Sequence, residues 1–267
     1  SPMNPALRTS ATGMMAQQLR TEVIANNLAN VNTTGFKRSR ASFEDLLYQT
    51  VQGAAVVGNP DTNTIPAVQV GRGTRLAAVQ RLHSQGPVEQ TSRPLDLAIE
   101  GEGFFQVQLP SGALAYTRDG SFGISDTGTL ITSNGYAVVP GIKIPTDATE
   151  ITISSTGKVS VSHSVTQVDK TELGQLELAR FMNPSGLQAL GENLFAETPA
   201  SGQPTVGFPS EEGMGRILQG HLEGSNVEIV QEMVDMISAS RSYQNSIEVM
   251  NTARSLLQKT LQMGQQV

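Results

Sequence analysis

The chain of 267 residues contains no cysteine. This absence excludes disulfide bonds, thiolate metal sites, iron–sulfur clusters and cysteine nucleophiles. The sequence also lacks an uninterrupted apolar stretch of the length that a helix needs to cross a bilayer, so no membrane span is expected. The length allows one large domain or two ordinary ones, and a hydrophobic core that needs no covalent support.

Positive charge is also scarce. The formal net charge is −6 and the sequence pI is about 5.1, which argues against a nucleic-acid binder and against a polybasic membrane clamp. Lys37, Arg38 and Arg40 form the one dense basic cluster, and we interpret them as a solvated turn.

Residues suited to catalysis or metal binding do not converge in the sequence. His83, His163 and His221 are far apart, lack the spacing of metal ligands, and are expected to be surface or structural residues. Gly101-Glu102-Gly103 resembles the start of a dinucleotide loop, but a strand pattern follows where a helix is required. We therefore expect no catalytic residue, no cofactor and no metal, and predict that the protein is not an enzyme.

Five carboxylates lie close together in the sequence, and such residues could form a calcium site or the catalytic pair of a glycosidase. Asp119 and Asp126 stand close to glycines, as turn residues do. The spacing does not supply oxygen ligands at alternate positions, so we expect none of these carboxylates to be catalytic. The group consists of Asp96, Glu100, Glu102, Asp119 and Asp126.

Both ends of the chain have helical patterns, because apolar residues recur mostly every three or four positions. The first pattern predicts a helix over about 4–33, which Asn32-Thr33-Thr34-Gly35 ends with residues that favour turns. The second predicts a helix over about 226–264, with Ser225 and Glu228 as a capping box. The first stripe comprises Leu7, Ala11, Met15, Leu19, Val23, Leu28 and Val31, and the second comprises Val230, Met233, Val234, Ile237, Tyr243, Ile247, Met250, Ala253, Leu257 and Leu261.

Neither apolar stripe can be buried by its own helix. We expect the two stripes to pack on each other and to be offered to neighbouring molecules. The alternative is an ordinary globular domain whose terminal helices cover a central sheet. Asn26, Asn27 and Asn30 are poor helix formers, and they indicate either a polar face or amides that specify the register between packed helices.

The middle of the chain has short runs of β-formers separated by glycine, typical of an antiparallel sandwich or partial barrel. Hairpins are predicted for 104–109 with 115–118 and for 151–153 with 159–161, and single strands for 176–181 and 217–222. Residues 42–51 have the composition of a short helical continuation, and 53–66 that of an extended loop.

The predicted fold class is therefore α+β, with paired terminal helices that enclose an antiparallel β-rich domain. We expect a coiled-coil-like helical module over 1–35 and 226–267 that is disordered in the monomer. Connecting segments are expected over 36–67 and 217–225, and the β-rich domain over 68–216.

Four segments together resemble the signatures of bacterial flagellar rod and hook proteins. They are Asn26–Lys37, Asp96–Phe105, Tyr116–Phe122 and Ser225–Val227, and their order and spacing cover essentially the whole chain. Within that family, the length and three further segments are most similar to subunits of the distal section of the rod. These segments are Phe43–Gln49, His83–Gly86 and Gly191–Leu194.

The resemblance implies a structural subunit that self-assembles helically into a rigid drive shaft and transmits torque from motor to hook. It implies a place in the basal body, in the periplasmic space, reached through the flagellar type III export apparatus. An N-terminus with Asn4, Arg8, Thr9 and Ser10 fits this route, because a Sec signal peptide would be apolar there. The implied partners are other copies of the chain, proximal rod proteins, the hook protein, the bushing rings and the export apparatus, with no nucleic acid.

Two alternatives remain open: a proximal rod or hook subunit of the same family, or a peptidoglycan- or ligand-binding β-domain that its helices oligomerise. In the axial interpretation, the helices form the assembly interface, and a segment of about 47–66 stiffens the rod. The expected interface residues are Leu7, Met15, Leu19, Asn26, Asn27, Leu28, Asn30, Val31, Phe36, Val230, Met233, Ile237, Ile247, Met250, Leu257 and Leu261. The expected rigidity residues are Leu47, Tyr48, Gly58, Pro60 and Pro66.

Overall fold

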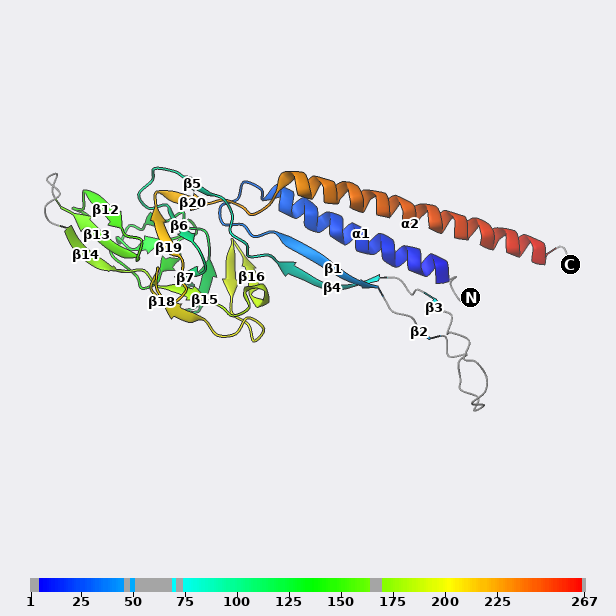
Figure 1. Ribbon diagram of the computed structural model, residues 1–267, viewed down its shortest axis with the longest axis horizontal. Helices are drawn as coiled ribbons and strands as arrows, with labels where there is room; N and C mark the ends of the chain where they lie inside the picture. Colours follow the sequence, from blue (N-terminus) through cyan, green and yellow to red (C-terminus); the bar gives the residue numbers. More distant parts are fainter. Residues whose placement is uncertain (1–4, 46–48, 51–68, 71–73, 164–169, 266–267) are drawn as a thin grey trace, which may run out of the picture. The chain divides into compact units, whose positions relative to one another are not determined.

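A computed structural model of the chain describes residues 5–45, 49–50, 69–70, 74–163 and 170–265. It has an α+β fold, with a long helix near each end of the chain and antiparallel sheets between them in the sequence (Figure 1). The chain forms two compact units. The first unit consists of residues 1–28, 39–80 and 228–267, and the second consists of 29–38 and 81–227.

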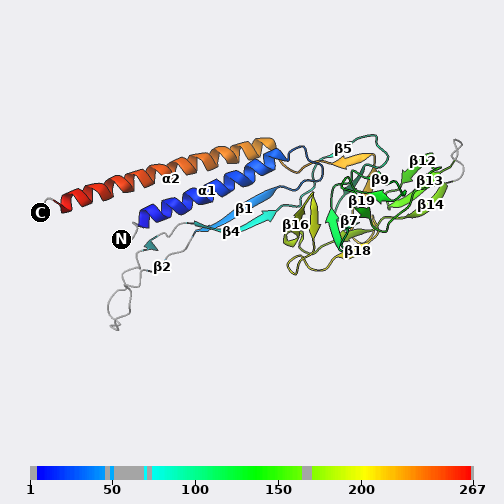
Figure 2. The same ribbon diagram turned by 180° about the vertical axis from the view of Figure 1, so that it is seen from behind.

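The first unit contains both helices. Helix α1 spans Pro5–Ala29 and helix α2 spans Ile229–Gly264. They lie side by side and run antiparallel, and α2 extends past the start of α1 (Figures 1 and 2). Asn27 Nδ2 lies 3.3 Å from Glu232 Oε2, and Arg20 lies 3.9 Å from Asp235.

The first helix ends at Ala29, four residues before the predicted end at about 33. After α1 the chain turns, with Thr33 N donating to Asn30 O and Gly35 at a φ of 70°. The capping box predicted for the second helix is wrong. Glu228 occupies the N-cap without a side-chain hydrogen bond, and Ser225 Oγ accepts instead from Val227 N. The helix begins later because residues 225–227 are held in the second unit by contacts described below.

The helix contact uses a different face of α2 from the one predicted. Glu232, Ala239 and Ala253 are its buried residues and share one position of a heptad repeat. A β-carbon at Gly13 of α1 would lie 3.3 Å from Ser246 Oγ, so the helices approach closely over small residues. The prediction that the apolar stripe of α2 packs on α1 is therefore wrong for most of its large residues, which are exposed. These are Val230, Met233, Val234, Ile237, Tyr243, Leu257 and Leu261.

The first unit also contains two short strand pairs. Strand β1 (Ser39–Asp45) pairs with β4 (Thr74–Arg81), and β2 (Gln49–Thr50) pairs with β3 (Gln69–Val70). The helical continuation predicted from residue 42 is wrong in its described part, because pairing with a distant strand outweighs a weak local preference. The rigidity residues Leu47, Tyr48, Gly58, Pro60 and Pro66 lie outside the described residues.

The second unit is built from antiparallel strands. Its largest sheet has the order β16-β17-β8-β7-β11-β10-β9, with β15 pairing with both β7 and β18. A three-stranded sheet has the order β12-β13-β14, and β6 pairs with β19 and β5 with β20. The strands are β5 (Val88–Gln90), β6 (Leu97–Glu100), β7 (Phe104–Gln108), β8 (Leu114–Thr117), β9 (Gly123–Ile124), β10 (Leu130–Ile131), β11 (Ala137–Val138), β12 (Glu150–Ile153), β13 (Lys158–Ser162), β14 (Lys170–Gln175), β15 (Leu178–Arg180), β16 (Gln188–Gly191), β17 (Leu194–Ala196), β18 (Thr205–Gly207), β19 (Arg216–Gln219) and β20 (His221–Glu223), with a 3-10 helix, η2, at Pro184–Gly186.

Both predicted hairpins are confirmed. Strand β7 pairs with β8, with Phe105 opposite Thr117, and β12 pairs with β13, with Ile151 opposite Val161. The strand predicted over 217–222 is confirmed as two short strands, β19 and β20, which pair with β6 and β5. The two strands that precede α2 are therefore part of the second unit.

Two apolar clusters hold this unit together. The larger includes Leu97, Ile99, Phe105 and Phe122, and the ring centroids of the two phenylalanines are 4.9 Å apart. The smaller comprises Phe104, Tyr116, Ala179, Phe181, Leu187 and Phe195. Because adjacent residues of β7 point to opposite faces, Phe104 and Phe105 enter different clusters. A polar site lies beside them.

Candidate functional site

Three charged side chains are buried together in the second unit. Lys37, Arg118 and Glu223 are 1%, 5% and 0% exposed. Lys37 Nζ lies 2.6 Å from Glu223 Oε1, and Arg118 Nε donates to Glu223 Oε2 over 2.7 Å. We call these three residues the buried charge cluster. The interpretation of Lys37 as part of a solvated turn is wrong, because the chain folds back over it.

Backbone groups and the side chain of Gln85 satisfy the rest of the buried charge cluster. Arg118 Nη1 donates to the carbonyls of Gly101 and Gly103, and Nη2 donates to Ile99 O and to Gln85 Oε1. Lys37 Nζ donates to Ser84 O over 2.7 Å, and Glu223 Oε1 also accepts from Gly86 N. Charges removed from water need this degree of hydrogen bonding.

The two cations of the cluster share one carboxylate. The pKa of Lys37 is set by burial and by the charges of the other two residues, which act in opposite directions. Burial lowers the pKa of the Lys37 ammonium, the charge and hydrogen bond of Glu223 oppose this, and the charge of Arg118 lowers it further. The carboxylate therefore keeps two buried positive charges together.

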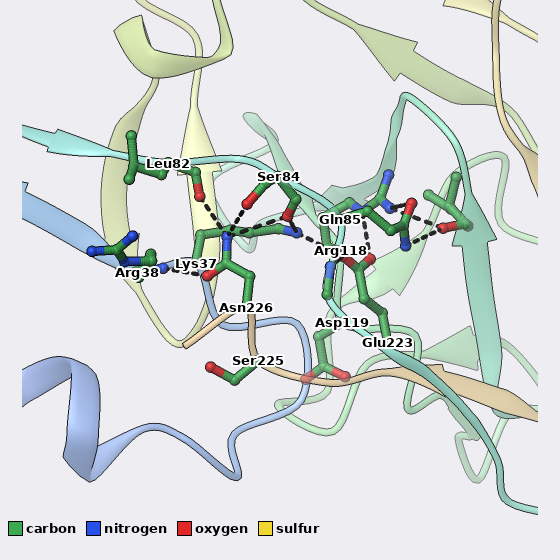
Figure 3. Close-up of polar contacts among 12 residues, drawn as sticks. Lys37, Arg38, Leu82, Ser84, Gln85, Arg118, Asp119, Glu223, Ser225 and Asn226 are labelled. Atoms are coloured by element: carbon green, nitrogen blue, oxygen red, sulfur yellow. Dashed lines mark hydrogen bonds and ion pairs between the residues drawn. The ribbon is translucent and has the colours of Figure 1, made fainter. Parts of the chain in front are cut away.

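Asn226 joins the segments by which the chain enters and leaves the second unit. Its Oδ1 accepts from Arg38 N over 2.7 Å, and its Nδ2 donates to Leu82 O over 2.8 Å and to Ser84 (Figure 3). Leu82 N in turn donates to Arg38 O. Three of the four boundaries between the units fall close to these residues, after residues 38, 80 and 227. These three connections thus emerge from one hydrogen-bonded junction, which we call the Asn226 junction.

We expect Asn226→Ala to lower the free energy of unfolding of the second unit by about 1–3 kcal/mol, because it removes the hydrogen bonds of this side chain to the backbone groups Arg38 N and Leu82 O. Urea denaturation of the purified full chain measures this. Asn134→Ala, at an exposed turn, is the control and should change stability by less than about 0.5 kcal/mol. Equal stability of the two variants would contradict the role given to the junction.

His83 is half-buried next to the buried charge cluster. Its ring packs edge-on against Phe104 and Phe195, with centroids 5.7 and 5.1 Å away. Neither ring nitrogen has a hydrogen-bond partner in the described part of the chain. Burial, together with the charges of Lys37, Arg81 and Arg118, lowers the pKa of His83 to about 4. The folded protein therefore holds this histidine neutral.

This shift predicts acid sensitivity. The unfolded chain protonates His83 near its ordinary pKa of 6.5, and the folded chain only near 4. Between these values the unfolded state binds more protons, so stability is complete at neutral pH and falls as the pH drops through this window, by about 2–3 kcal/mol. Urea denaturation at several pH values should show the drop in the wild type and a smaller one in His83→Phe. His163→Gln, at a more exposed histidine, should keep the wild-type profile.

Three family models match the chain in order. Residues 7–37 match the Flagella basal body rod protein model. Residues 98–161 match the Flagellar hook protein FlgE/F/G D1 domain, and residues 218–263 match the Flagellar basal body rod FlgEFG protein C-terminal model.

Similar proteins extend the match over the whole chain. The chain is 49% identical to the flagellar basal-body rod protein FlgG of Caulobacter vibrioides, covering 97% of this chain and 98% of that protein. Identity to FlgG of Borreliella burgdorferi is 50%, covering 96% and 97%, and to FlgG of Bacillus subtilis 38%, covering 97% and 98%. The chain belongs to the flagellar rod and hook protein family.

The three regions that match the family models also contain the residues of the buried charge cluster. Each of the three matched regions contributes one member of the buried charge cluster: Lys37 from the first, Arg118 from the second and Glu223 from the third. Lys37 and Arg118 stand in segments that carried the sequence resemblance, whereas Glu223 lies just before one. Their shared role was missed because nothing in one sequence indicates that residues so far apart meet.

The residues expected at the assembly interface fall into three groups in this family member. Asn27 and Phe36 are buried within the single chain. Asn27 exchanges hydrogen bonds with the backbone of Ser39 and donates to Glu232, and Phe36 lies under Arg81. The exposed residues are Met15, Asn26, Val230, Met233, Ile237, Leu257 and Leu261. The half-buried residues are Leu19, Leu28, Asn30, Val31, Ile247, Met250 and Leu7.

Three of the carboxylates considered for catalysis, Asp96, Glu100 and Asp119, have structural partners. Asp119 Oδ1 accepts from Ser121 N and Oγ within a turn, as predicted, and Glu100 pairs with Arg216. Among the described residues, no group of three or more histidines and carboxylates is placed to hold a metal ion. In the same part of the chain, no helix is both long and apolar enough to cross a membrane.

Proposed function

We propose that this protein is a subunit of the distal section of the flagellar rod, where copies assemble helically into a rigid drive shaft that transmits torque from motor to hook. The observation that carries this proposal is the end-to-end similarity to rod proteins named FlgG, with 97% of this chain and 98% of the Caulobacter vibrioides protein covered. The role is structural, and the proposal includes no catalytic step.

The share of each protein that the match covers favours a rod subunit over a hook subunit. The hook protein FlgE of Treponema pallidum is 41% identical, but over 51% of this chain and only 29% of that protein. A hook protein of that kind contains a large region without a counterpart here. The proposal therefore favours the rod over the hook.

Self-assembly is supported by the apolar face that α2 leaves uncovered. Ile229, Val230, Met233, Val234 and Ile237 are between 47% and 76% exposed along the first turns of the helix. A run of large apolar side chains with this exposure marks an interaction surface. Other copies of the chain are the proposed occupants, and an open helical assembly needs heterologous contacts of this kind.

Pairing of α1 and α2 is proposed to be coiled-coil-like, because the buried residues of α2 follow a heptad repeat. Small and polar contact residues bury little apolar area, and we therefore predict that both helices become ordered mainly on assembly. Hydrogen exchange of the monomer tests this: fast exchange over α1 and α2 is expected, and strong protection there would contradict it.

A shaft that carries torque needs subunits that resist internal deformation. The Asn226 junction and the buried charge cluster tie together three of the four segments through which force enters or leaves the second unit. The proposed partners are proximal rod proteins, the hook protein and the bushing rings. The proposed location is the basal body in the periplasmic space, reached through the type III export apparatus.

Deletion of the gene in the source organism, followed by electron microscopy of isolated basal bodies, tests the function. A rod that ends before its distal section is expected. A complete rod that lacks only the hook would assign the chain to the hook. Intact flagella would overturn the axial role in favour of a ligand- or peptidoglycan-binding protein.

A further inference from the structure

A cavity of about 600 Å³ opens beside the buried charge cluster, within the second unit. Its walls combine cationic groups with apolar ones, and its size lies in the range of about 300–1,000 Å³ typical of ligand sites. We call it the cationic pocket. It is lined by Lys37, His83, Gln85, Gly101, Glu102, Gly103, Phe104, Arg118, Arg180, Phe181, Met182, Pro184 and Thr205.

Positive charge exceeds negative charge at the cationic pocket. Lys37, Arg118 and Arg180 face two carboxylates, Glu102 in the wall and Glu223 behind it. Within the described residues, Arg180 has no hydrogen bond or ion pair from its side chain, in contrast to Arg118. An anionic group that entered the pocket would therefore find a guanidinium that the fold leaves available.

The fold makes room for that guanidinium. Gly213 has a φ of 79°, and a β-carbon at this position would collide with Arg180 Nη1. His83 also lines the pocket, and neither of its buried ring nitrogens has a hydrogen-bond partner in the described chain. Met182, a pocket residue that is 95% exposed, adds a large apolar contact at the surface. The pocket thus suits a carboxylate attached to an apolar or peptide segment.

We propose that the cationic pocket receives a carboxylate-bearing segment of a neighbouring copy of the chain. This inference rests on the proposed function, in which copies lie next to one another. Charge complementarity favours a copy as the occupant, since the chain has 24 Asp and Glu residues against 18 Lys and Arg and a net charge of −6. The pocket would then help to fix the orientation of one subunit relative to the next. The apolar contacts of the helices would act alongside it.

The first test reverses the charge of Arg180. Arg180→Glu, expressed in the deletion strain, is expected to reduce the amount of this chain in isolated basal bodies by about tenfold or more. Lys158→Glu makes the same change at an exposed lysine of β13 and should stay within about twofold of wild type. Both purified variants should keep the wild-type urea midpoint. Normal incorporation of a folded Arg180→Glu protein would overturn the proposal.

The second test identifies the occupant. A photoreactive amino acid at position 182 of the full chain, activated in assembled basal bodies, should crosslink to a peptide of a second copy that contains Asp or Glu. Reversing that acidic residue to Arg should restore assembly of Arg180→Glu. Crosslinks only to another protein, only to peptidoglycan, or to nothing would overturn the proposal while leaving the rod function intact. Absence of the wild-type chain from basal bodies would instead overturn the rod function itself.

Discussion

Replacing Glu223 by glutamine is expected to lower the free energy of unfolding of the second unit by about 3–5 kcal/mol. The substitution keeps the size of the side chain but removes the one carboxylate that both Lys37 and Arg118 contact. Two buried cations then face each other without compensation, and an amide hydrogen points at one of them. Urea denaturation of the purified full chain measures the loss, and cells carrying the variant should swim poorly.

Glu100→Gln is the matched control. Glu100 forms an ion pair of 2.9 Å with Arg216, but their side chains are 49% and 54% exposed, so solvent screens the interaction. This variant should lose less than about 1 kcal/mol. If Glu223→Gln were no less stable than Glu100→Gln, the buried charge cluster would not be a main source of stability in this unit.

Replacing Ile237 by aspartate is expected to abolish rod assembly while the second unit stays folded. Ile237 is 55% exposed in the single chain, so the charge costs little there. In an assembled seam the same carboxylate would be buried without a partner, at a cost of several kcal/mol for every subunit. The expected result is complete loss of motility with a wild-type urea midpoint for the second unit.

Ser238→Asp places the same charge one residue further along α2, at an exposed polar position that lies outside the apolar run. Cells with this variant should assemble rods. Electron microscopy of basal bodies from both strains makes the comparison. Normal rods with Ile237→Asp would show that the exposed apolar face of α2 is not the assembly seam.

The helices and hairpins were predictable because their signals are local. The spacing of apolar residues identified both helices, Asn32 to Gly35 marked the end of the first, and glycine-punctuated β-formers located the β7–β8 and β12–β13 hairpins. The short signature segments likewise identified the family without any knowledge of packing. The start of α2 was mistaken, because Ser225 and Glu228 satisfy a local rule that tertiary contacts at Asn226 override.

The site itself depended on contacts between distant parts of the chain. Lys37 and Glu223 are 186 residues apart, and the pattern around each indicates an ordinary turn or strand end. Likewise, helical periodicity showed that α2 has an apolar stripe but not which partner covers it. In the folded chain small residues such as Ala239 face α1 and most of the large ones remain exposed, because close helix approach excludes bulky side chains. Local sequence thus specified the elements and the family, whereas chain folding alone decided which charges are buried together and which apolar surface stays exposed in the single chain.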